Sequence, residues 1–168
     1  MSAADRCALR YDVLLELTST EQHRWHDWFI EHPKAWAVPF ATGRMATIGG
    51  VVMHIFAVEL RYAQRLLDQE VTAWEAFRQT SIEDVFELGD DARAQLVHFL
   101  TTAPESELDR VLNFQTLTAG PVSASKYRIA SNLFLHGIRH WGQVATVLRQ
   151  NGFADQWSHD LLLSGVKM

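Results

Sequence analysis

The stretch "LFLHGIRHWGQVATVLRQNG", residues 133–152, carries two histidines one helical turn apart, His136 and His140. Side chains four residues apart on a helix project from one face, with Cβ atoms about 5–6 Å apart. Two imidazoles at that spacing can bind one divalent ion at about 2.0–2.1 Å each. The same stripe of the helix carries Leu133 and Val144. The pair is therefore predicted to lie on or beside a buried stripe, where an unpaired polar group costs about 1–3 kcal/mol.

A third ligand has to come from another helix, and His54 is the best candidate. It lies within "IGGVVMHIFAVEL", with Val51 and Val58 on its own face. One histidine from this helix and two from the later one can converge in the core of a bundle. Three neutral imidazoles leave at least one coordination position open, which suits a catalytic site better than a structural one. The sequence leaves an alternative open, in which each histidine is an ordinary core or surface residue.

Other polar residues near these histidines have less specific patterns. Gln143, three residues beyond the second histidine of the pair, is expected to support a ligand imidazole or a bound water, or to be an ordinary helix amide. Glu59 follows His54 by five residues, which turns it about 140° away on a helix. It is expected to bridge to another helix, to act as an acid or base near the site, or, as the favoured interpretation, to be exposed to solvent. Charged and polar neighbours predict a solvated face for His23 and His26 as well.

The elements that must position these residues are four amphipathic helices. The three-and-four spacing of apolar residues predicts them over about residues 5–31, 44–69, 82–102 and 123–150, the last with Ser123 or Ser125 at its start. Gly49 and Gly50 either permit a close helix contact or mark a later helix start. Strand patterns are scarce. The predicted fold class is therefore all-α, a four-helix bundle.

Two long connections argue against a simple up-down-up-down order of these helices. The first, "PKAWAVPFATGR", holds two prolines and a glycine, and predicts an irregular linker long enough to cross the bundle. The second, residues 104–126, contains Thr, Gly and Pro residues compatible with a short extended pair. Four large aromatic residues are expected either to fill the core or to line a pocket: Trp25, Trp28, Phe56 and Trp141.

Length and charge bound the class of protein. A chain of 168 residues is expected to form a single domain, 1–168. The net charge of −5 leaves no basic stripe for binding nucleic acid. No apolar run approaches the roughly 18 residues that span a membrane, and the first residues lack the apolar core of a signal peptide. Cys7 is the only cysteine, so we expect no intramolecular disulfide and a cytoplasmic protein.

The chain resembles the DinB/YfiT-like superfamily over roughly residues 10–152. The resemblance rests on "MHIFAVELRYAQRLL" followed by "LFLHGIRHWGQVATVLRQNG". Members share a lone histidine in the second helix, then an H-x-x-x-H pair that often continues as H-R-G-Q, and an "LR-x-x-G" helix end. Here Trp141 replaces the frequent arginine, whereas Gly142 and Gln143 match.

This resemblance implies a four-helix bundle with long crossover connections and a divalent metal held by a histidine triad. The ligands would be His54, His136 and His140, and the metal zinc or nickel. Relatives are commonly homodimers. Some are thiol-dependent enzymes, namely maleylpyruvate isomerases that use mycothiol and transferases that use bacillithiol, and many others have no assigned activity.

Two kinds of function follow from these patterns. The first is an enzyme with an open three-histidine site: a thiol-dependent S-transferase or isomerase, in which the ion lowers the pKa of a low-molecular-weight thiol, or a hydrolase that activates water. The second is a non-catalytic, stress-related module that binds a metal or ligand. The sequence names neither a catalytic residue, the small-molecule substrate nor the native metal, because imidazole accepts several divalent ions.

Overall fold

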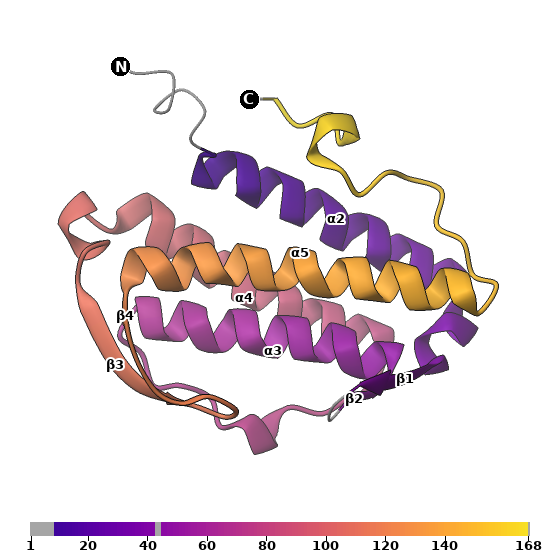
Figure 1. Cartoon of the computed structure of the whole chain (residues 1–168), viewed down its shortest axis with the longest axis horizontal. Coiled ribbons are helices and arrows are strands. Elements are labelled where there is room, and N and C mark those ends of the chain that lie inside the picture. Colours follow the sequence, from indigo (N-terminus) through magenta and orange to yellow (C-terminus); the bar gives the residue numbers. More distant parts are fainter. Residues whose placement is uncertain (1–8, 43–44, 168) are drawn as a thin grey trace.

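A computed structural model describes residues 9–42 and 45–167 of the chain, which form four α-helices and two antiparallel hairpins (Figure 1). In chain order these are α2 (Tyr11–Glu31), β1 (Pro39–Thr42), β2 (Met45–Thr47), α3 (Ile48–Leu66), α4 (Ile82–Thr102), β3 (Val111–Thr116), β4 (Gly120–Ser125) and α5 (Lys126–Gln150). Short 3-10 turns lie at Pro33–Ala37, Trp74–Ala76, Glu105–Glu107 and Leu161–Leu163. The all-α prediction is confirmed, and Cys7 lies outside the described residues.

Hydroxyl side chains define where three of the helices begin. Thr47, Ser81 and Ser125 each accept a hydrogen bond from the backbone N–H three residues later, at 3.2, 3.0 and 3.2 Å. Such N-caps satisfy donors that the first turn leaves without partners. The predicted start of α4 is confirmed, and Ser125 is the cap of α5. In contrast, α2 begins only at Tyr11, and α3 begins at Ile48 because strand β2 occupies the preceding residues.

Gly49 permits a close contact between the start of α3 and Trp36, one of the two roles that the sequence left open. A Cβ built on it would lie 2.5 Å from the ring of Trp36, a distance that no real Cβ tolerates. The late start of α3 and the close approach therefore occur together: the first turn of the helix packs directly on an indole ring.

The helices run up, down, down and up. Phe56 of α3 contacts Phe86 of α4, and Glu59 of α3 lies beside Arg93 of α4. Residue numbers therefore increase in the same direction along the two helices, which are parallel. A parallel pair needs a connection that returns along the bundle. Residues 67–81 make this crossover, passing below α3 in Figure 1.

The proline-rich linker does not cross the bundle, contrary to the prediction. Thr18 of α2 accepts a hydrogen bond from Arg93, and His26 stacks on Phe86, so α2 is antiparallel to α4 and hence to α3. The linker therefore joins neighbouring helix ends, and it folds into a 3-10 turn and the β1–β2 hairpin. The second long connection contains the expected extended pair, β3–β4, which pairs in register from Val111↔Ser125 to Thr116↔Gly120.

Aromatic side chains dominate the core at the end of the bundle near the β1–β2 hairpin. Trp25 stacks on Trp141 with ring centroids 5.7 Å apart and planes 8° apart. Trp28 and Phe56 are also buried in this cluster. All four aromatic residues that were expected in a core or a pocket are thus core residues. None of the helices in the described part of the chain combines the length and the apolar character needed to cross a bilayer.

Candidate metal centre

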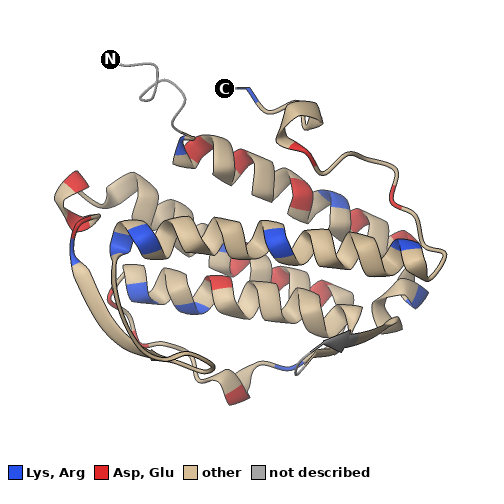
Figure 2. Cartoon of the chain, in the orientation of Figure 1, with Lys and Arg blue, Asp and Glu red and all other residues tan. Residues whose placement is uncertain are grey.

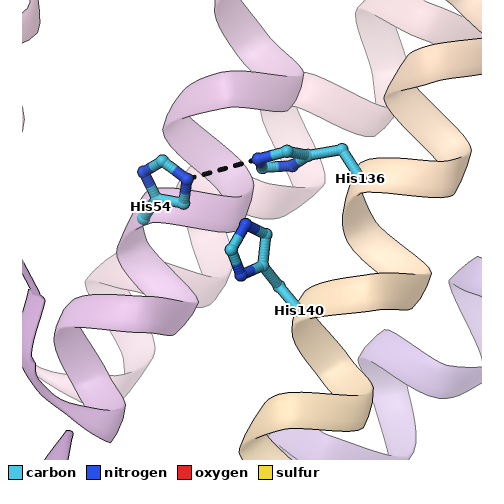
Figure 3. A group of neighbouring side chains, drawn as sticks. All are labelled: His54, His136 and His140. Atoms are coloured by element: carbon cyan, nitrogen blue, oxygen red, sulfur yellow. Dashed lines mark hydrogen bonds between the residues drawn. The ribbon is translucent and has the colours of Figure 1, made fainter. Parts of the chain in front are cut away.

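The structure brings together the three predicted histidines from two helices. His54 projects from α3, and His136 and His140 project from successive turns of α5 toward it (Figure 3). One ring nitrogen from each lies within 4.8 Å of the other two. The closest pair is His54 Nε2 and His136 Nε2, 3.2 Å apart. The triad is thus a compact cluster of nitrogen donors.

A glycine allows the two helices to approach at this level. Gly137 directly follows the first histidine of α5 and is buried. A Cβ on it would lie 3.1 Å from Glu59 Oε1 on α3, which is tighter than nearly all real contacts. The missing side chain therefore lets α5 pack against α3 beside the imidazoles.

Gln143 fixes which nitrogen of His140 carries the proton. His140 Nδ1 lies 2.7 Å from Gln143 Oε1. An amide oxygen can only accept a hydrogen bond, so Nδ1 carries the proton and Nε2 keeps its lone pair, which accepts a hydrogen bond from Arg139 Nη2 at 3.2 Å. This is the orientation that hydrogen-bond partners commonly impose on ligating histidines. His136 Nδ1, in contrast, is buried with no partner among the described residues.

Burial keeps the imidazoles uncharged. Burial first, and then the nearby His140 and Arg139, together lower the pKa of His136 to about 3 and that of His54 to about 4. Burial also lowers the pKa of His140, against the Gln143 hydrogen bond, which raises it. Neutral rings at pH 7 offer lone pairs without first losing a proton, which is what a cation requires.

The donor set fits a divalent cation. Two imidazole nitrogens bound to a tetrahedral ion at about 2.0–2.1 Å lie about 3.3 Å apart. The separation of 3.2 Å between the nitrogens of His54 and His136 matches that value. Three nitrogen donors would leave a tetrahedral ion with one position for another ligand.

A cleft of about 630 Å³ opens onto the triad. Met53 and Tyr62 of α3 line it. Its two walls come from connections: Trp74 from the crossover, and Phe114 of strand β3 with Leu117 of the following turn from the β3–β4 hairpin. Trp74 lies edge-on to His54, with ring centroids 5.6 Å apart. A volume of this size suits a small-molecule ligand. Sequence reasoning missed both walls because neither connection carries a motif.

Two residues near the triad, Glu59 and His26, are less exposed than expected, and Glu59 takes the alternative in which it bridges to another helix. Glu59 is buried, with 3% of its surface exposed, and its Oε2 lies 3.4 Å from Arg93 Nη2. Burial raises the pKa of Glu59, against the lowering effect of Arg93. The reason is that α3 packs against α4 on one side and α5 on the other, so it has no solvent face there. His26 is partly buried against Phe86, whereas His23 is exposed as predicted.

Comparison with known proteins identifies one family. The model of the DinB family matches residues 16–163, a span that holds all three histidines and both walls of the cleft. No curated protein matches the chain at a significant level.

Proposed function

The chain belongs to the DinB family, and from that premise we propose that His54, His136 and His140 together hold one divalent cation. The observation that carries the proposal is the convergence of three ring nitrogens within 4.8 Å from two helices. The orientation of His140 by Gln143 and the low pKa values of His54 and His136 support it. Gln143 accordingly supports the site without binding the ion.

The metal is proposed to be zinc or nickel. Imidazole suits both ions, and the donor set contains neither the thiolate that copper(I) prefers nor the oxygen cage that magnesium and calcium prefer. The resemblance to DinB-like proteins points to the same two metals.

We propose a thiol-dependent S-transferase or isomerase that uses a low-molecular-weight thiol as cosubstrate. An ion with an open position would supply a Lewis acid that makes a thiol more acidic. The protein's own residues keep the imidazoles neutral, orient His140 and shield one side of the site from water through Trp74. A cleft that reaches the triad favours this class over a purely structural ion, which would be enclosed.

A hydrolase is a weaker candidate. Metal-dependent hydrolases commonly pair the ion with a carboxylate that acts as general base. The described residues that line the cleft include no Asp or Glu, and Glu59 lies in the core beside Arg93.

The proposed assembly is a cytoplasmic homodimer. Large apolar side chains stay exposed on the outer side of α5, with 57% of Tyr127, 62% of Leu135 and 39% of Ile138 accessible. A second copy packed on this helix would cover them. Size-exclusion chromatography with light scattering gives the mass directly, and a monomer at micromolar concentration would contradict this part of the proposal.

Elemental analysis of protein purified without a histidine tag tests the metal site. We expect about one zinc or nickel per chain, and a higher melting temperature after either ion is added to stripped protein. A thermal-shift screen of mycothiol, bacillithiol, glutathione and coenzyme A should then find a thiol that stabilises only the metal-loaded protein. Protein that purifies without metal, and whose melting temperature ignores both ions, would contradict the proposal.

A further inference from the structure

The cleft beside the triad has positive charge and no acidic residue. Three arginines line it: Arg61 and Arg65 from α3, and Arg139 from α5. Among the described residues, none of the three forms an ion pair with an Asp or Glu. Figure 2 shows the wider pattern, in which acidic residues recur along α2 and α4 while α5 carries only basic ones. The positive charge of the cleft therefore has no carboxylate counterpart within it.

Arg61 and Arg65 extend the stripe of α3 that holds His54. They follow it by seven and eleven residues, which places them about 10 and 16 Å further along the helix axis on nearly the same face. Val58 and Tyr62 lie on this stripe and also line the cleft. The cleft thus has two chemically different ends, with imidazoles at one and guanidinium groups at the other.

Neutral groups hold both guanidinium groups in place. Arg61 Nη1 donates to the carbonyl oxygen of Thr72 in the crossover. Arg65 Nη1 donates to the carbonyl oxygen of Arg61 at 2.9 Å, and its guanidinium lies 4.7 Å from the centre of the Phe114 ring. Backbone carbonyls and an aromatic face orient a cation without neutralising it. Each guanidinium has five N–H donors, so donors remain free for a ligand.

The crowding of these charges costs free energy. Burial lowers the pKa of Arg65, and the neighbouring Arg61 lowers it further. An anion between two partly buried guanidinium groups offsets that cost, because it forms charge-assisted and often bidentate hydrogen bonds.

We propose that the cleft takes a small organic anion, whose acidic group binds Arg61 and Arg65 and whose apolar body lies on Tyr62, Trp74 and Phe114. The rest of the molecule points toward the histidines. Only the part of this inference that concerns the histidine end of the cleft rests on the proposed function. The anion subsite itself consists of residues outside the triad. It narrows the substrate class from small molecules in general to carboxylates or related acids with an apolar body.

Three probes with one apolar body test the head group: phenylbutyrate, phenylbutanol and phenylbutylamine. We expect isothermal titration of the zinc-loaded protein to give at least about tenfold tighter binding of the carboxylate than of the alcohol, and no binding of the amine. Added sodium chloride should weaken carboxylate binding and leave alcohol binding unchanged. Equal affinity for the carboxylate and the alcohol would overturn the proposal.

Variants assign the preference to the arginines. Arg61→Gln and Arg65→Gln should each lose about tenfold in carboxylate affinity while keeping alcohol affinity. Arg128→Gln is the matched control, because Arg128 is an exposed arginine of α5 that does not line the cleft. Circular dichroism and melting curves establish whether each variant folds. If a variant does not fold, the effect of sodium chloride on carboxylate binding by the unmodified protein tests the proposal instead. A carboxylate preference that survives both substitutions would overturn the proposal.

His136→Ala separates this inference from the metal site. The same preference, still dependent on Arg61 and Arg65, should persist in that variant and would stand even if no ion binds. A preference that vanishes in His136→Ala and ignores the arginines would mean that the ion holds the carboxylate, which overturns the anion subsite and leaves the metal site intact.

Discussion

Replacing His136 with alanine should abolish the stabilisation that zinc gives to the fold. A ligand that binds only the folded state stabilises it by about 2.7 kcal/mol at a concentration one hundred times its dissociation constant. Unfolding entropy is about 2.1 cal/mol/K per residue near 60 °C, which gives about 0.35 kcal/mol/K for 168 residues. Zinc at that concentration should therefore raise the melting temperature of the unmodified protein by about 8 °C.

Loss of one of three ligands should reduce this shift to near zero in His136→Ala. Without zinc the variant should melt only about 3 °C below the unmodified protein. It loses the 3.2 Å contact between His136 Nε2 and His54 Nε2, whereas His136 Nδ1 has no partner among the described residues. His98→Ala is the matched control, since His98 lies exposed on α4 and outside the triad. Differential scanning fluorimetry of protein stripped of metal, with and without zinc, gives both numbers.

If His136→Ala keeps the full shift, zinc binds elsewhere and the triad is not its site. A shift that His98→Ala also loses would show that zinc acts non-specifically. No shift in the melting temperature of the unmodified protein, together with no zinc by elemental analysis, would mean that the protein does not bind zinc.

Three further predictions concern stability, measured by urea denaturation. Gly89→Ala should cost about 1–3 kcal/mol, because its Cβ would meet the Phe56 ring at 2.8 Å, whereas Gly142→Ala, with open space around it, should be neutral or stabilising. Arg93→Ala should cost about 3 kcal/mol by leaving Glu59 buried and unpaired, and Glu59→Gln in that background should recover part of the loss. Without metal, the free energy of unfolding should fall as pH drops from 6.5 toward 4, because the triad binds protons more readily when unfolded.

The sequence predicted the helices and the His136–His140 pair because both depend on spacing within one helix. Two histidines four residues apart must share a face wherever that helix packs. His54 followed from the same logic, as a polar residue inside an apolar stripe of α3. The helix caps at Ser81 and Ser125 also depend on residues close together in the sequence, and the structure contains both.

What the sequence did not predict depends on contacts between distant segments. Glu59 was expected in water because one helix face was taken as buried, but α3 is covered by both α4 and α5. Its partner Arg93 is 34 residues away and carries no motif. Trp74 and Phe114 line the cleft only because the crossover and a hairpin both bend over α3. Periodicity reports nothing about where such connections lie.

The nitrogens of the histidine triad belong to helices, whereas the two walls of the cleft belong to connections. This division has a consequence for the evolution of the molecule. Residues 67–81 and the turn between β3 and β4 can lengthen, shorten or change composition without moving the bundle core. Grafting a foreign connection should therefore change which apolar bodies the cleft accepts, while the proposed anion preference of Arg61 and Arg65 and the proposed ion site, both on helices, stay constant.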